Sequence, residues 1–192
     1  MRLKLTALMI SLVLLCGCAA AGRDRERVET LRARVSGAES ISFRAVLEAD
    51  DGETRERYVL LCTRSGGETE LCLLYPELIG GVTARLSENG AVLRYDDLSF
   101  ETGALDAEGL RPIAAPDLIL SALKTGIVSQ LRRESLDGNE TLAFRVLSVK
   151  GYFVDVWIDA DSLVLYRAEI LSGDRAAIRC DVFEWKLDTK EG

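Results

Sequence analysis

The segment Val154–Ile170, VDVWIDADSLVLYRAEI, carries the clearest structural pattern in the chain. The valines and the isoleucine of its first half alternate with other residues, which is the two-residue period of a β-strand. Trp157 falls on the opposite side from them, so we expect both faces of the sheet to be at least partly covered. The acidic turn at 159–161 has too few oxygen ligands, and no glycine, for a calcium loop, so we expect a plain hairpin turn there.

Strand patterns extend outward from this segment in both directions. Around it they predict a meander of four strands, at residues 140–149, 152–159, 163–171 and 176–187. Nearer the N-terminus they predict strands at residues 41–49, 55–64, 69–75, 82–87 and 91–96, with a short one near Leu98 and Phe100. We therefore expect about nine or ten strands, separated by turns such as Asn89-Gly90, in one domain.

Two segments have helical periodicity. Residues 23–36 form a predicted helix with one apolar face, made of Val28, Leu31 and Val35, and Gly37 ends it.

The second predicted helix covers residues 116–134. Pro116 suits a first helical position, and an apolar residue recurs at every fourth place, at Ile119, Leu123, Ile127 and Leu131. This stripe is broad enough that we expect the helix to lie across the inner face of a curved sheet. Gly126 lies in the middle of the helix, where glycine costs roughly 1 kcal/mol relative to alanine.

The order of these elements resembles the lipoprotein-sorting carrier and receptor family, LolA and LolB. Residues 154–170 are similar to that family's strand–turn–strand, in which a Trp-Ile-Asp sequence and an acidic turn precede a strand with Arg and Glu. Residues 76–95, PELIGGVTARLSENGAVLRY, look like the mid-chain hairpin of shorter Gram-positive relatives, and germination lipoproteins of clostridia are similar in design. The resemblance implies an α+β, mainly β fold: a curved antiparallel sheet, or unclosed β-barrel, with helices covering its concave face.

The same resemblance implies a function. Such a half-barrel would hold a lipophilic ligand, such as an acyl chain or a lipoprotein, on its concave side. The residues that we expect to line this cavity are the apolar stripe and the two tryptophans: Ile119, Leu123, Ile127, Leu131, Trp157 and Trp185. The alternative is a scaffold of the same fold that binds and regulates an enzyme of the cell envelope or spore cortex. A large apolar cavity would favour the first function, and a filled core with an exposed patch would favour the second.

The N-terminus resembles the signal of a bacterial lipoprotein. Arg2 and Lys4 precede an apolar run at 5–15, which is too short to span a bilayer. The sequence Leu-Cys-Gly-Cys at 15–18 resembles the lipobox, whose last cysteine is acylated after cleavage immediately before it. An ordinary cleaved signal with incidental cysteines is the alternative.

The lipobox resemblance implies a division of the chain into three parts. These are a signal peptide (1–17), a lipidated anchor with a short tether (18–22) and a single LolA/LolB-like domain (23–192). Cys18 would carry the lipid, palmitate for example, and would hold the domain at the extracytoplasmic face of a bacterial membrane.

Charge and composition argue against several functions. The chain has a net charge of −7, and removal of the signal would leave 22 basic against 31 acidic residues, a net charge of about −9. Nucleic acid is therefore an unexpected partner, because its binding depends on basic patches. The sequence contains no histidine, which excludes Ser-His and Cys-His catalysis and histidine zinc sites. We expect no enzyme activity, no catalytic residue, no metal and no cofactor.

Three cysteines remain outside the N-terminal region: Cys62, Cys72 and Cys180. An oxidising compartment permits a disulfide between the first two. A three-residue connection would place them directly opposite each other on paired strands, near disulfide distance. A two-residue turn would instead oppose Leu61 to Cys72, and Cys180 is either the rival partner or a buried free thiol. We expect the Cys62–Cys72 disulfide.

Overall fold

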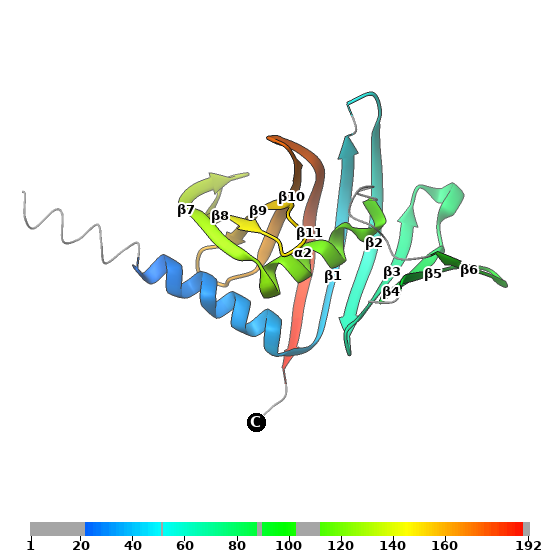
Figure 1. The fold of residues 1–192 in the computed structure, drawn as a ribbon, viewed down its shortest axis with the longest axis horizontal. Helices are drawn as coiled ribbons and strands as arrows, with labels where there is room; N and C mark the ends of the chain where they lie inside the picture. Colours follow the sequence, from blue (N-terminus) through cyan, green and yellow to red (C-terminus); the bar gives the residue numbers. More distant parts are fainter. Residues whose placement is uncertain (1–21, 51, 88–89, 103–111, 190–192) are drawn as a thin grey trace, which may run out of the picture.

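The fold appears in Figure 1 as a computed structural model, which describes residues 22–50, 52–87, 90–102 and 112–189. An N-terminal helix over residues 22–37 leads into β1 (Ala38–Asp50), β2 (Arg55–Ser65), β3 (Glu68–Tyr75), η1 (Glu77–Ile79), β4 (Thr83–Ser87), β5 (Gly90–Tyr95) and β6 (Leu98–Thr102). After η2 (Pro112–Ala114) and α2 (Ala115–Thr125) come β7 (Ile127–Leu136), β8 (Asn139–Leu147), β9 (Phe153–Asp159), β10 (Leu165–Ser172) and β11 (Arg175–Thr189).

The described strands form one antiparallel sheet, in the order β6-β5-β4-β3-β2-β1-β11-β10-β9-β8-β7. The first and last strands, β1 and β11, pair with each other at its centre. The chain therefore runs outward through hairpins to one edge, β6, and returns from the other edge, β7. Since β6 and β7 are not paired with each other, the sheet stays open. This confirms the mainly β, unclosed antiparallel fold expected from the sequence.

Both helices lie over the same side of the sheet, which we call the inner face (Figure 1). The apolar side of the N-terminal helix is buried as predicted, at Val28, Leu31 and Val35. α2 crosses the middle of the sheet and contacts β8, β10 and β11. In the described part of the chain, neither helix combines the length and apolar character needed to cross a membrane.

The prediction of a helix over residues 116–134 is wrong in its C-terminal half. α2 ends at Thr125, Gly126 has an extended backbone (φ −75°, ψ 170°), and the following residues form the edge strand β7. A bulge interrupts the pairing of β7 with β8 between Ser129 and Arg132. Because a bulge inserts extra residues into one strand, it shifts the alternation of side chains and produces an apolar spacing that looks helical.

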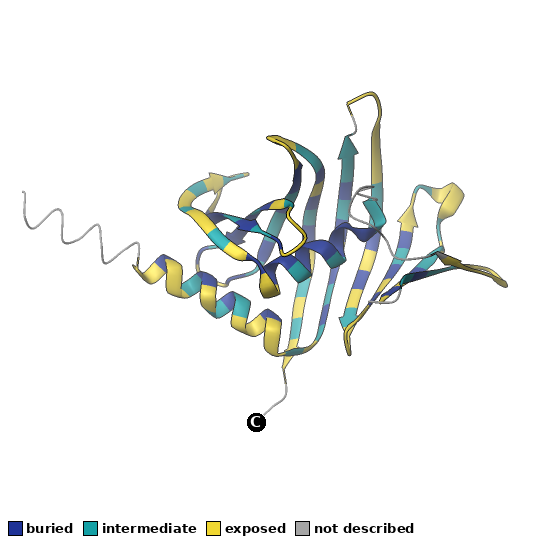
Figure 2. Cartoon of the chain, viewed as in Figure 1, coloured by how far each residue is buried: buried dark blue, intermediate teal, exposed yellow. Residues whose placement is uncertain are grey.

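The hydrophobic core lies between the inner face and the helices, as the burial colours of Figure 2 show. Its fully buried side chains come from strands on both sides of the centre and from α2: Leu47, Leu60, Leu71, Leu142, Phe144, Ile158, Ile170, Ile119, Leu120 and Leu123. The broad apolar stripe of α2 therefore does lie against the inner face, as predicted.

Hydrogen bonds hold α2 at both ends. At its C-terminal end, Arg32 of the N-terminal helix donates to the carbonyl oxygens of Leu123 (2.9 Å) and Gly126 (2.7 Å). The last carbonyls of a helix have no partner within the helix, so these bonds satisfy groups that would otherwise be unpaired. Near its N-terminal end, Asp117 accepts a hydrogen bond from Arg64 of β2 at 2.8 Å. These hydrogen bonds fix both ends of α2 over the core.

Asp24 connects the N-terminal helix to β7, and acid should break this connection. Arg133 donates to both oxygens of the Asp24 carboxylate, at 2.8 and 2.5 Å, and these hydrogen bonds hold the pKa of Asp24 below its usual range. A group with a lowered pKa in the folded state contributes stability above its unfolded pKa and loses it as the pH falls through the folded pKa. Because a hydrogen bond to a charged group contributes about 1.5–3 kcal/mol, and half-exposed Arg133 is screened by water, we expect Asp24→Asn to cost about 1–2 kcal/mol at pH 7.

Urea unfolding at pH 7 and below pH 4 measures this contribution. The wild type should lose more stability than Asp24→Asn across that interval, because the variant has no carboxylate to protonate. Glu26→Gln is the matched control, since Glu26 is exposed on the same helix. Equal losses in the two variants at pH 7 would show that the ion pair contributes nothing.

Candidate functional site

The six residues predicted to line a cavity are divided between three places. Ile119 and Leu123 are buried in the core, at 2 % and 0 % exposure. Trp185 is partly buried at the border of the core, where its ring centroid lies 5.4 Å from that of Phe43. Its indole N–H is buried and has no hydrogen-bond partner among the described residues.

The other three candidates lie on β9 and on the edge strand β7. Trp157 is on the outer face, opposite the helices, where its indole N–H donates to the Glu134 carboxylate. Ile127 and Leu131 belong to β7 rather than to the helix, and Ile127 is 69 % exposed. The expectation of one cavity lined by all six residues is therefore wrong, but Leu131 does line a pocket.

This pocket lies between the N-terminal helix and β7, and we call it the helix–β7 pocket. Its volume is about 400 Å³, and it is lined by Asp24, Arg25, Val28, Val128, Ser129, Gln130, Leu131 and Arg132. The apolar lining comes from Val28, Val128 and Leu131. The bulge in β7 shapes one wall, where Gln130 has a φ of +52°. Leu131, which the sequence pattern places on a helix, therefore lies on a strand and lines this pocket.

A second and larger hollow lies on the outer face, and we call it the outer pocket. Its volume is about 680 Å³. It is lined by the tip of the β7–β8 hairpin, the start of β10 and part of β11: Leu136, Asp137, Asn139, Val164, Tyr166, Arg167, Asp181, Val182, Phe183 and Glu184. None of these residues is among the candidates drawn from the sequence.

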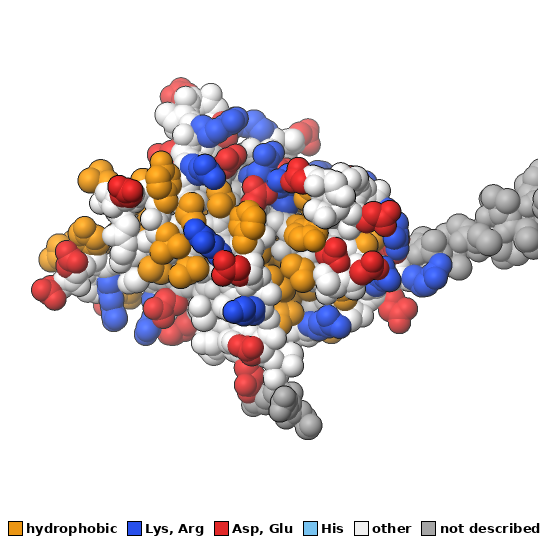
Figure 3. All heavy atoms as spheres, turned by 180° about the vertical axis from the view of Figure 1, so that it is seen from behind, with side chains coloured by type: hydrophobic (Ala, Val, Ile, Leu, Met, Phe, Trp, Pro, Cys, Tyr) orange, Lys and Arg blue, Asp and Glu red, His pale blue; other side chains and the backbone are white. Residues whose placement is uncertain are grey.

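Apolar side chains also gather on the outer face, as the view from behind shows (Figure 3). Phe183 and Leu61 are 52 % and 43 % exposed, and both pair with Arg44 of β1, one on each side. Tyr75, opposite Val59, is 48 % exposed. The chain thus presents an apolar surface on the face that the helices leave uncovered.

The disulfide predicted between Cys62 and Cys72 does not form, and the described cysteines are free thiols. The connection between β2 and β3 is a two-residue turn, so Cys62 pairs with Leu71 and Leu61 pairs with Cys72. Successive residues of a strand point to opposite faces. Cys62 is therefore buried in the core while Cys72 lies on the other face, and burial raises the pKa of the Cys62 thiol to about 12. Cys180 is buried as well, and burial also raises its pKa.

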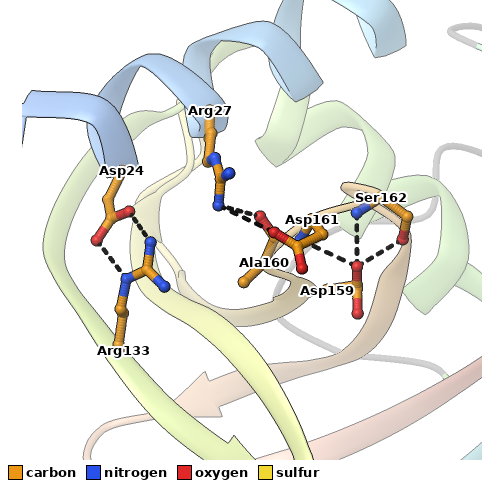
Figure 4. A network of polar contacts seen from close by, with 7 residues as sticks. All are labelled: Asp24, Arg27, Arg133, Asp159, Ala160, Asp161 and Ser162. Atoms are coloured by element: carbon orange, nitrogen blue, oxygen red, sulfur yellow. Dashed lines mark hydrogen bonds and ion pairs between the residues drawn. The ribbon is translucent and has the colours of Figure 1, made fainter. Parts of the chain in front are cut away.

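The acidic turn after β9 has a structural explanation (Figure 4). The Asp159 carboxylate accepts hydrogen bonds from the backbone N–H of Ser162 (2.6 Å) and of Asp161 (3.0 Å), and these bonds help to keep its pKa below the usual range. Arg27 of the N-terminal helix donates to the Ala160 carbonyl at 2.6 Å. This is the hairpin turn expected from the sequence. The hydrogen bond from Arg27 also holds the N-terminal helix against this turn. Within the described ranges, no three His, Cys, Asp or Glu side chains are placed to hold a metal ion.

No family model matches the chain, and no curated protein matches it by sequence. Solved structures do match by their fold. A DUF1329 family protein from Desulfovibrio piger is 11 % identical, with a TM-score of 0.51 over 89 % of this chain and 94 % of that protein. An uncharacterized conserved protein from Thermus thermophilus is also 11 % identical, with a TM-score of 0.50 over 88 % of both chains.

A putative outer membrane lipoprotein-sorting protein domain from Vibrio parahaemolyticus is 10 % identical, with a TM-score of 0.48 over 87 % of this chain and 93 % of that domain. At these identities the comparisons bear on the fold alone. The strand order and the likeness to the first two of these structures show that the chain has the fold expected from the sequence, an open antiparallel sheet with helices across one face.

Proposed function

We propose that this chain is a membrane-anchored extracytoplasmic lipoprotein that binds a lipophilic ligand, such as an acyl chain, in the helix–β7 pocket. The observation that supports the proposal most directly is the pocket itself. Its volume of about 400 Å³ is within the range of about 300–1,000 Å³ that is usual for small-molecule sites. Val28, Val128 and Leu131 offer an apolar surface, and burial of each ligand methylene there is worth about 0.8 kcal/mol.

Two further features fit an amphiphilic ligand. Arg25 and Arg132 line the pocket together with its apolar residues. Because Arg132 already donates to Glu134 at 2.7 Å, Arg25 is the guanidinium that an anionic headgroup would meet while the chain is buried. Asp24, which also lines the pocket, is six residues after Cys18 in the sequence. Six residues span at most about 20 Å, so a lipid on Cys18 would keep the pocket close to the membrane from which its ligand comes.

The binding proposal is tested by extraction and by one substitution. We expect organic extracts of the purified protein to contain a lipophilic molecule, detected by mass spectrometry at near-stoichiometric amount. Leu131→Glu replaces an apolar lining residue with a carboxylate. We expect it to weaken binding of a fluorescent fatty acid about ten-fold or more, because the acyl chain loses apolar contact and the new carboxylate repels the anionic headgroup. Leu98→Glu is the control, since Leu98 is exposed on the opposite edge strand. If both variants bind the probe like the wild type, the pocket is not the site.

The anchor is tested separately. Cys18 lies outside the described residues, and the lipobox resemblance supports its role. A thioether cannot form on alanine, so we expect Cys18→Ala to leave the signal uncut or to release the protein from membranes. Cys16→Ala should remain acylated. Fractionation and intact-mass spectrometry distinguish the two, and acylation that persists in Cys18→Ala but fails in Cys16→Ala would move the anchor to Cys16.

A second function is favoured by a different observation. The apolar side chains of the outer face, Leu61, Tyr75 and Phe183 among them, are exposed rather than enclosed. An exposed apolar area of this kind is typical of a surface that binds another protein. Extracts without lipid, together with unchanged probe binding in Leu131→Glu, would favour this non-enzymatic scaffold, which regulates an envelope enzyme, over the lipid-binding function.

A further inference from the structure

The outer pocket differs in chemistry from the helix–β7 pocket. We propose that it binds a cationic group carried on an apolar body: an ammonium, amidinium or guanidinium group, either of a free organic molecule or of a partner's lysine or arginine side chain. This site is on the outer face and does not depend on the lipid-binding function.

The shape of the pocket is the first argument. Its volume of about 680 Å³ is well within the range of small-molecule sites. Three separate segments form its walls, with Leu136 from the β7–β8 hairpin, Tyr166 from β10 and Phe183 from β11. Their side chains give an apolar surface with two aromatic rings.

The balance of charge is the second argument. Asp137, Asp181 and Glu184 line the pocket, whereas Arg167 is its single basic lining residue. Arg167 is already engaged, because its Nε donates to Asp181 at 2.5 Å and its Nη2 donates to Asp137 at 3.1 Å. The Asp137 side chain is still 74 % exposed. Glu184 forms no ion pair within the residues that the structure describes. The lining therefore has an excess of two negative charges.

These two arguments together select the ligand. An aromatic ring attracts a cation through its negatively polarised face, by about 0.5–1 kcal/mol at exposed sites and more when the cation is desolvated. A cation held against Tyr166 or Phe183 would also meet the carboxylate of Glu184. An anion would be repelled by the carboxylates, and a wholly apolar ligand would remove them from water without compensation. The net charge of −7 also favours the approach of cations.

The backbone explains how the aromatic ring and the carboxylate come together. The pairing of β1 with β11 has a bulge between Phe183 and Lys186, and Glu184 has a φ of +55°. In a regular strand, successive side chains point to opposite faces. The bulge breaks that rule, so Phe183 and Glu184 both line the outer pocket.

A matched pair of small molecules tests the charge requirement. 4-Aminobenzamidine carries a cationic amidinium on an aromatic ring, and 4-aminobenzamide has nearly the same shape without the charge. We expect titration calorimetry of the full chain at low salt to show the amidine binding at least about ten-fold more tightly than the amide, which corresponds to about 1.4 kcal/mol. Added salt should weaken amidine binding. Affinities equal within about two-fold, or no saturable binding of the amidine, would overturn the proposal.

Charge-removing variants then locate the site. We expect Asp137→Asn and Glu184→Gln each to weaken amidine binding by about three-fold or more, because each removes one carboxylate from the pocket. The Asn-Gly turn that Asp137→Asn creates is a favoured hairpin turn, so this variant should fold. Asp97→Asn makes the same charge change at an exposed turn at the other edge of the sheet and should bind like the wild type. If the two pocket variants also bind like the wild type, the cation does not bind there.

A further binding experiment, with peptides, distinguishes a free organic cation from the basic side chain of a partner protein. An acetylated Ala-Arg-Ala amide is compared with its citrulline counterpart, which has the same length and no charge. Binding of the arginine peptide but not of the citrulline peptide, abolished in Glu184→Gln, would indicate a partner's basic side chain. Binding of the amidine alone would indicate a free organic cation. Binding of the citrulline peptide as tightly as the arginine peptide would contradict a cation site.

Discussion

Replacement of Leu123 with aspartate is expected to unfold the domain. Leu123 is 0 % exposed and lies on α2, which packs against β8, β10 and β11 on the inner face of the sheet. Loss of a buried leucine costs about 2–5 kcal/mol by itself, and burial of an unpaired carboxyl group adds several more. The sum is comparable with the whole stability of a typical domain, about 5–15 kcal/mol.

Circular dichroism and thermal melting measure this effect. We expect Leu123→Asp to show no cooperative transition, whereas Lys124→Asp, which adds a carboxylate to the next and exposed residue, should fold. Lys124 is in the last turn of α2, so its replacement should cost no more than about 1 kcal/mol from the helix dipole. A Leu123→Asp variant that melts like Lys124→Asp would show that α2 is peripheral to the core.

Strands away from the edges of the sheet, such as β9, are predictable because their inner sides are buried in the core. Val154, Val156 and Ile158 are each 0 % exposed, and this burial is the physical cause of their alternation in the sequence. β7 is an edge strand that carries a bulge, so its side chains follow no simple period. Ile127 and Leu131 continue the four-residue spacing of the apolar residues of α2 by coincidence. The sequence pattern therefore predicts a helix that extends beyond the true end of α2 at Thr125.

The candidate sites depend on backbone conformation and strand register, which are harder to predict from the sequence. The outer pocket depends on the left-handed backbone of Glu184, and no glycine or asparagine marks that position. The register of β2 and β3 depends on whether the turn contains two residues or three. Both turns fit Gly66-Gly67, and the two-residue turn separates Cys62 from Cys72. Strand alternation places Trp157 on the face opposite Val154, Val156 and Ile158, but the alternation does not show which of the two faces the helices cover.

Gly126 is the residue at which α2 must stop, and alanine there is expected to be strongly destabilising. Its backbone angles are accessible to any residue, so the reason is steric. A Cβ at this position would lie 2.3 Å from the Val146 side chain, 2.7 Å from the Ala122 carbonyl oxygen and 2.8 Å from the Leu147 carbonyl oxygen. Two of these three contacts are with backbone atoms, which cannot rotate away. The helix and β8 would have to separate.

Overpacking of this kind costs about 1–3 kcal/mol and sometimes more, and we expect Gly126→Ala to lie at or above the upper end of that range in urea unfolding. Gly37→Ala is the matched control, because Gly37 ends the N-terminal helix and a Cβ there meets nothing within 4 Å. Alanine is the better helix former by about 1 kcal/mol, so the control should be neutral or slightly stabilising. The two variants make the same chemical change at the ends of the two helices, and only Gly126→Ala is expected to be destabilising. If Gly126→Ala were as stable as Gly37→Ala, α2 would not approach β8 this closely, and the end of the helix would be set by the bulge of β7 instead.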